Sequence, residues 1–177
     1  MPHHLRIQLA CPDDRGLLAA VTGRLYELGG DVGDAAFSLI GEEATMSCVC
    51  AFQESVSAGA VQDALRSLPA LSKGEVSVAP FTLGTTHEAT GHATHVIRVR
   101  GEDQPGLMAR LAEGFGETGA NVVRMDAERV ERQAGGEYAM RFELWIPEGR
   151  EDTCLADAAN TAEHLGMTFN AEPVNDE

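Results

Sequence analysis

Two short segments in the second half of the chain carry residue types that could bind a small charged molecule. The first is the acidic, glycine-containing segment GEDQPGL (residues 101–107), which precedes a helical pattern, and the second is NV (residues 121–122), which opens a strand. A helix start leaves about four backbone N–H groups without intrahelical partners, and with the helix dipole these groups attract anions. Asp103 or a carbonyl oxygen could attract an ammonium group. We therefore expect a site for a small zwitterion, with its carboxylate at the helix start.

The same residues also have a purely structural interpretation. Aspartate, proline and glycine at a helix start are ordinary capping residues, and Asp103 could cap the helix. Pro105 suits the first helical turn, where its missing N–H costs nothing, and Gly106 lets a ligand approach the backbone closely. The strand that begins at Asn121 is expected to return a polar side chain to the loop. The two interpretations remain open at this point.

The pattern occurs a second time near the start of the chain, at an offset of 90 residues. In an ungapped alignment of residues 11–32 with residues 101–122, seven of 22 positions are identical, and these include Asp13, Gly16 and Leu17, which align with Asp103, Gly106 and Leu107. A repeat of this period indicates a duplicated domain. We expect domains at residues 1–84 and 94–177, joined by a polar linker at residues 85–93. Domains this small are marginally stable alone, so they should pack on each other or on a second chain.

Each half shows the same order of predicted elements. Alternating apolar residues predict strands and three- or four-residue spacing predicts helices. The predicted strands are residues 5–10, 31–40, 44–52 and 74–83, then 94–100, 121–130, 138–146 and 167–174. The first helix of each half begins near Leu17 or Leu107 and ends at Gly29-Gly30 or Gly119, and the second helices cover residues 57–68 and 152–165. The order βαββαβ, found twice, predicts an α+β fold of two ferredoxin-like domains in tandem, with antiparallel sheets and helices on one face.

Composition excludes several classes of protein. The formal net charge is −15, with 28 acidic residues against 13 lysines and arginines and no basic run, which is unsuited to direct binding of nucleic acid or of an anionic membrane. No stretch approaches the roughly 20 apolar residues needed to span a bilayer. The N-terminus, MPHHLRIQLA, lacks the pattern of a signal segment, so a cytoplasmic location is expected.

Cysteines and histidines show no metal-binding or catalytic arrangement. The repeat aligns Cys48 and Cys50 with the apolar residues Phe142 and Leu144, which favours core packing for both thiols. The histidines near the linker have no cysteine or tight acidic cluster beside them, so no metal site is expected. Neither a nucleophile elbow nor a phosphate-binding loop is present, and no base can be paired with a nucleophile. The chain is therefore expected not to be an enzyme and to need no cofactor.

The segments DQPGLMARL and GANVV resemble the signature of the ACT domain, in which D-x-P-G-x-L begins the first helix and G-x-N-[VI] begins the second strand. The segment CPDDRGLLAAVTGRLYELGGDV is similar to the form found in tandem ACT proteins of the glycine cleavage system transcriptional repressor type, and to the N-terminal ACT domain of formyltetrahydrofolate deformylase. The resemblance implies amino-acid binding, often at an interface between two ACT modules. The motif carries over to Asp103, Pro105, Gly106, Leu107 and Asn121 in the second half, and to Asp13, Gly16 and Leu17 in the first. Gln104, Val122 and Asp31 lie within or beside these segments and are further candidate ligand-binding residues.

The first half departs from that signature at two positions. Arg15 stands where proline is usual, and Asp31 stands where asparagine is usual. An aspartate there would repel a carboxylate. The second half is therefore the favoured site, and the first half has changed its ligand or lost binding.

The resemblance implies a non-catalytic regulatory protein. It would bind a small amino acid, with glycine as the first candidate, and would modulate a protein partner such as a transcriptional regulator. A homo-oligomer, in the first instance a dimer, is expected, because paired sheet edges would satisfy open edge strands. Three alternatives remain open: a regulatory subunit of an amino-acid biosynthetic enzyme, a structural dimerisation module that binds no ligand, or a small enzyme such as a hydrolase fragment, for which no residues remain to form a catalytic domain.

Overall fold

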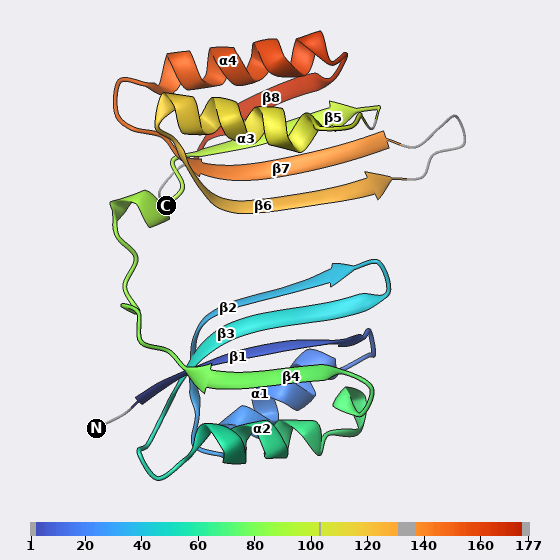
Figure 1. Cartoon of the computed structure of the whole chain (residues 1–177), viewed down its shortest axis with the longest axis vertical. Helices are drawn as coiled ribbons and strands as arrows, with labels where there is room; N and C mark the ends of the chain where they lie inside the picture. Colours follow the sequence, from blue (N-terminus) through green and yellow to red (C-terminus); the bar gives the residue numbers. More distant parts are fainter. Residues whose placement is uncertain (1–2, 103, 131–136, 175–177) are drawn as a thin grey trace. The chain divides into compact units, whose positions relative to one another are not determined.

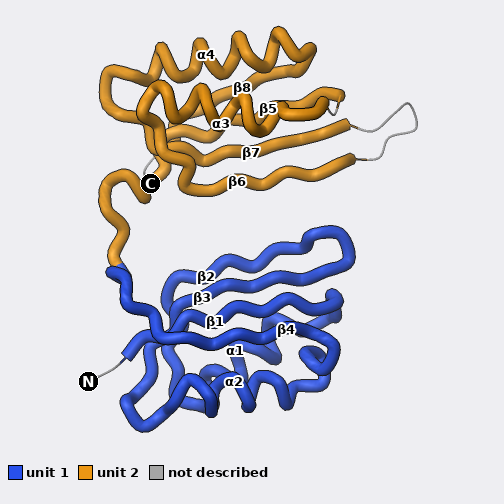
Figure 2. Tube along the Cα trace, viewed as in Figure 1, with its two compact units in different colours: residues 1–85 blue, residues 86–177 orange. Residues whose placement is uncertain are grey.

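The computed structural model describes residues 3–102, 104–130 and 137–174. The chain divides into two compact units, with the boundary between Thr85 and Thr86 (Figure 2). Each unit repeats the same order of elements, four strands and two α-helices, which Figure 1 labels along the chain.

Unit 1 contains the strands β1 (His3–Pro12), β2 (Asp31–Ile40), β3 (Glu43–Phe52) and β4 (Glu75–Pro80), and the helices α1 (Leu17–Glu27) and α2 (Ala58–Arg66). A short 3-10 helix, η1 (Pro69–Leu71), follows α2. Unit 2 opens with a 3-10 turn, η2 (Ala89–Gly91), and continues with β5 (His95–Gly101), α3 (Leu107–Thr118), β6 (Asn121–Val130), β7 (Glu137–Trp145), α4 (Glu151–His164) and β8 (Thr168–Pro173).

Each unit folds into one four-stranded antiparallel sheet. The strand orders are β2-β3-β1-β4 and β6-β7-β5-β8, so β2 and β4, and β6 and β8, are the edge strands. In each unit the two helices cover the same face of the sheet (Figure 1). The predicted fold class, two ferredoxin-like βαββαβ units in tandem with helices on one face, is confirmed.

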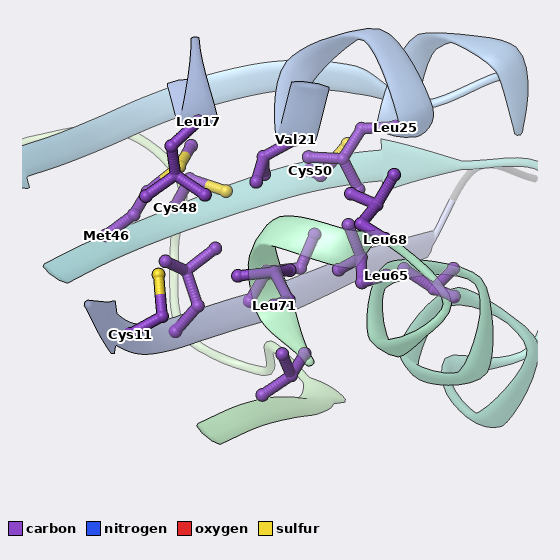
Figure 3. Close-up of a cluster of buried hydrophobic side chains, with 14 of the residues drawn as sticks. Cys11, Leu17, Val21, Leu25, Met46, Cys48, Cys50, Leu65, Leu68 and Leu71 are labelled. Atoms are coloured by element: carbon purple, nitrogen blue, oxygen red, sulfur yellow. The ribbon is translucent and has the colours of Figure 1, made fainter. Parts of the chain in front are cut away.

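The core of each unit lies between the helices and the sheet. In unit 1 the apolar face of α1 (Leu17, Val21 and Leu25) meets alternate residues of β3, among them Cys48 and Cys50 (Figure 3). Both thiols are almost fully buried, which confirms the predicted core role of these cysteines. In unit 2 the rings of Phe115 and Phe142 meet edge-on with centroids 5.2 Å apart, a favourable arrangement of aromatic quadrupoles.

Most of the predicted element bounds hold within a few residues, and two features differ. β4 ends at Pro80 rather than at residue 83, although the N–H of Phe81 still donates to His4 O of β1 at 2.9 Å. The predicted linker is not uniformly irregular, because it contains η2. The turn predicted at residues 131–136 lies outside the described residues.

Glycines end the first helix of each unit as predicted. Gly29 has φ 76° and Gly119 has φ 80°, the left-handed conformation that terminates a helix at little cost only for glycine. None of the helices in the described part of the chain is long and apolar enough to cross a membrane.

Candidate functional site

The loop before α3 brings backbone donors to the surface. Gly106 precedes α3 in the left-handed conformation, with φ 80°, and a Cβ placed there would meet no atom within 4 Å. The N–H of Leu107 donates to Gln104 O at 3.3 Å, and the first intrahelical hydrogen bond runs from Arg110 N–H to Gly106 O at 3.0 Å. The backbone N–H groups of the two residues between them, Met108 and Ala109, make no hydrogen bond within the described chain. Such donors at a helix start suit an anion.

The other predicted residues of this loop have distinct roles. Leu107 is buried in the core of unit 2, so its side chain anchors α3 and does not face a ligand. The Gln104 side chain donates from Nε2 to Leu165 O at 2.8 Å, which ties the loop to the end of α4. Pro105 is exposed and precedes the Gly106 cap, so the prediction that it lies in the first helical turn is wrong. Asp103 lies outside the described residues.

Asn121 and Val122 open the edge strand β6. Asn121 pairs with Trp145 and Val122 with Leu144 of β7, after which a β-bulge shifts the register. The Asn121 side chain is exposed, and its Nδ2 donates to Thr90 O in η2 at 2.8 Å. The amide oxygen of Asn121 accepts no hydrogen bond from any described residue.

The structure separates these two groups of residues. Strands β5 and β6 both pair antiparallel with β7, so they run in the same direction. The loop before α3 follows the end of β5, whereas Asn121 is the first residue of β6, and α3 connects the two ends (Figure 1). A helix of 12 residues is about 18 Å long. The prediction that β6 returns Asn121 to the loop within one unit is therefore wrong.

Unit 1 repeats this arrangement. Gly16 precedes α1 with φ 81°, and Leu17 is buried beneath the helix. The Asp13 N–H donates to Glu42 O at 2.9 Å, and the cap of α1 at Gly16 receives no side-chain hydrogen bond, so Asp13 does not act as the cap. Asp31 begins β2, at the end of the sheet opposite to this loop, because β1 and β2 also run in the same direction.

Charge makes unit 1 the less suitable site for a carboxylate. Burial raises the pKa of the Cys11 thiol, and the negative charges of Asp13, Glu43 and Asp14 raise it further, so the loop end of unit 1 has a negative potential. At the other end, Asp31 and Asp34 line a hollow of about 260 Å³ together with His4 and Phe81. The acidic side chains at each end of unit 1 therefore disfavour the binding of a carboxylate.

The cysteines are unsuited to nucleophilic chemistry. Burial raises the pKa of Cys48, and burial together with the charges of Cys48 and Asp31 raises the pKa of Cys50 to about 12. All four cysteines are free and buried. Within the described ranges, no group of three or more His, Cys, Asp or Glu side chains could hold a metal ion.

Two residues at these sites, Thr90 and Leu165, were not predicted, and both act through backbone carbonyls. Thr90 O accepts from Asn121, and Leu165 O accepts from Gln104. Every residue has a backbone carbonyl, so the residue type at these two positions does not reveal the role. Only the fold brings these acceptors to the side chains that use them.

Comparison with known proteins agrees with this architecture. Residues 95–144 match the family described as ACT domain. A crystal structure of an unknown protein from Galdieria sulphuraria superposes with a TM-score of 0.78 at 18% identity, covering 99% of this chain and 100% of that chain. The structure of a candidate glycine cleavage system transcriptional repressor superposes with a TM-score of 0.64 at 11% identity, covering 99% of each chain. At these identities the likeness shows a shared fold. No curated protein sequence matches the chain.

Proposed function

We propose that this chain is a non-catalytic regulatory protein of the cytoplasm that senses a small amino acid and modulates a protein partner. The observation that carries the proposal is a pair of donors at the start of α3, Met108 N–H and Ala109 N–H, which have no partner among the described residues and lie in the segment that matches the ACT domain family. These donors suit the carboxylate of an amino acid. The oxygen of the Asn121 amide suits its ammonium group.

A second module must complete the site. A small amino acid is only a few ångströms long, whereas α3 separates the two groups by about 18 Å. β6 is an edge strand, so it could pair antiparallel with β6 of a second copy. The first residue of one β6 would then lie beside the last residue of the other. β6 ends at the same end of the sheet as β5, where the loop before α3 begins. Asn121 of one copy would therefore lie near the start of α3 in its partner.

Glycine is the first candidate ligand, followed by serine. This choice follows the resemblance to tandem ACT proteins of the glycine cleavage type, and the structure itself specifies only the carboxylate and ammonium of the ligand. Ligand binding would favour the arrangement of modules that completes the site, and a partner that recognises this arrangement would gain or lose affinity. The net charge of −15 favours a protein partner, for example a transcriptional regulator, over direct contact with DNA.

A thermal-shift screen against the twenty amino acids, followed by calorimetric titration, tests the proposal. A ligand that binds the native state raises the melting temperature in proportion to the logarithm of its concentration. Asn121→Ala should abolish the rise. Asn170→Ala, which removes an exposed asparagine from the opposite edge strand β8, should preserve it. A flat response to all twenty amino acids would refute the sensor.

One alternative has a structural observation in its favour. The edge strands expose large apolar residues, namely Phe37, Leu39 and Ile40 on β2 and Val122, Val123 and Met125 on β6. Such edges suit a dimerisation module that binds no ligand. A tight dimer with no response to any amino acid would favour that alternative, and co-purification with a catalytic subunit would favour a regulatory subunit of a biosynthetic enzyme.

A further inference from the structure

The segment that leads into unit 2 forms an ordered turn against the start of β6. We call residues 87–92 the linker turn. Within it, Gly91 N–H donates to Glu88 O at 2.8 Å and His92 N–H donates to Ala89 O at 3.2 Å. The rings of His87 and His92 meet edge-on, 5.9 Å between centroids. A Cβ at position 91 would lie 3.1 Å from His87 Cβ, which is a close contact.

The chain just after the linker turn is fixed to the sheet of unit 2. Thr94 N–H donates to Leu144 O at 2.7 Å, and Val174 N–H donates to Thr94 O at 2.8 Å. The Thr94 hydroxyl accepts from Ile146 N–H at 3.0 Å. These bonds hold one end of the linker turn, and the Asn121 side chain holds its middle through Thr90 O.

The bond to Thr90 determines how the Asn121 amide is presented. A carboxamide has a donor nitrogen and an acceptor oxygen in one plane, so fixing the nitrogen fixes the oxygen. With one N–H of Nδ2 on Thr90 O, the amide oxygen and the second N–H have no other partner among the described residues. The oxygen accepts from an ammonium group and repels a carboxylate.

We propose that the linker turn is a ligand-coupled strap. It orients Asn121 so that the amide oxygen accepts a hydrogen bond from the ammonium group of the ligand. The bound ligand in turn strengthens the hydrogen bond from Asn121 Nδ2 to Thr90 O. An ammonium on the amide oxygen polarises the amide and makes its N–H a better donor, since hydrogen bonds in a chain reinforce one another. This proposal rests on the proposed function.

Unit 1 has no counterpart to this coupling. Asp31, the repeat equivalent of Asn121, is a carboxylate when ionised and cannot donate to a carbonyl. Asn121 and the linker turn both lie in unit 2. Replacing it by aspartate removes the donor and keeps an oxygen acceptor for an ammonium group.

Amide hydrogen exchange of the full chain, measured by NMR, tests the strap. In the protein without ligand, Asn121→Asp should accelerate exchange at Gly91 and His92 by roughly 3- to 10-fold, the scale of one modest hydrogen bond. Ser72 N–H, which donates to Pro69 O in the comparable turn η1 of unit 1, is the matched control and should not change. If the exchange rate at Gly91 is the same in Asn121→Asp and in the wild type, the strap proposal is wrong, whether or not the chain binds an amino acid.

The second arm adds glycine, and then each of the other standard amino acids, to the wild-type chain. A saturating ligand should shift the amide signals of Met108 and Ala109 and slow exchange at Gly91 and His92 by a similar factor, because coupling between two sites is reciprocal. Shifts at Met108 and Ala109 with unchanged or faster exchange at Gly91 would overturn the strap and leave the sensor intact. No shift with any amino acid would overturn both.

Discussion

Gly106 and Asn121 lie at opposite ends of helix α3, although both belong to the segments expected to form one ligand site. The separation follows from topology, since β5 and β6 run in the same direction and α3 returns the chain between them. A unit with this topology presents backbone N–H donors at one end and a side-chain amide at the other. The proposed sensor is thus built to work as a pair of modules.

The left-handed Gly106 determines how α3 begins. Gly106→Ala should lower the free energy of unfolding of unit 2 by about 1–2 kcal/mol, because a Cβ is disfavoured at φ 80° even where there is space for it. The measurement is urea unfolding followed by the fluorescence of Trp145, the single tryptophan of the chain, which reports on unit 2.

Gly114→Ala is the control for this prediction. It lies within the same helix, has no neighbouring atom within 4 Å of a Cβ, and lacks a positive φ. It should leave stability unchanged or raise it by roughly 0.4–1 kcal/mol. Equal losses for the two variants would show that the conformation of Gly106 has no special role.

The raised pKa of the buried Cys50 thiol predicts that the free energy of unfolding falls at alkaline pH. The pKa of Cys50 is raised to about 12 in the folded chain from a value of 9.0, so the folded state keeps its proton when the unfolded state has lost it. The thiol contribution is fully present below pH 9.0 and is lost as the pH rises towards 12. Between these pH values the free energy of unfolding should fall by up to about 1.4 kcal/mol per pH unit because of this thiol.

Unfolding in urea at a series of pH values measures this slope. Cys50→Ala should reduce it, although the variant is also less stable at neutral pH because it loses core volume. The four native thiols should react slowly with a thiol reagent at pH 8 and rapidly once unfolded. Rapid reaction of Cys50 in the folded chain would contradict its assignment to the core.

The edge strand β6 is the predicted surface of self-association. Met125→Lys places a charge on this exposed strand and should weaken the dimer by roughly tenfold or more, since charges on an edge oppose edge-to-edge pairing. Light scattering across a concentration series gives the dissociation constant. Leu83→Lys changes an equally apolar, exposed residue that follows β4 and should have no effect. A dimer insensitive to Met125→Lys would place the interface elsewhere.

Local patterns predicted the elements well, and the reason is visible in the core. Alternation along β7 placed Met140, Phe142 and Leu144 on one face, and all three are buried beneath α3 and α4. The aligned repeat likewise placed Cys48 and Cys50 in the core of unit 1. These predictions depend on the two-residue alternation of side chains along a strand, which can be read from the local sequence alone.

The candidate site was predictable only in part. Glycine at a helix start indicated the conformation of Gly16 and Gly106 correctly, because few other residues adopt a positive φ. The distance between Gly106 and Asn121 was predictable from the helix expected between them, since 12 helical residues span about 18 Å, and the prediction that Asn121 returns to the loop overlooked that length. The contact of Asn121 with Thr90 depends on a backbone carbonyl, which every residue has.

A complementation experiment tests the central claim, that one site is assembled from two copies, most directly. Ala109→Asp puts a carboxylate among the donors at the start of α3, where it also favours the helix, and Asn121→Ala removes the amide at the other end. Either variant alone should bind no amino acid. The two variants are co-expressed with different tags and the mixed dimer is purified.

Calorimetric titration of this mixed dimer with the amino acid found for the wild type then gives the number of sites. The account predicts about half of the wild-type stoichiometry, because a two-fold dimer of the two variants restores one intact site and leaves the other doubly altered. A mixed dimer that binds no more ligand than either variant alone would contradict it.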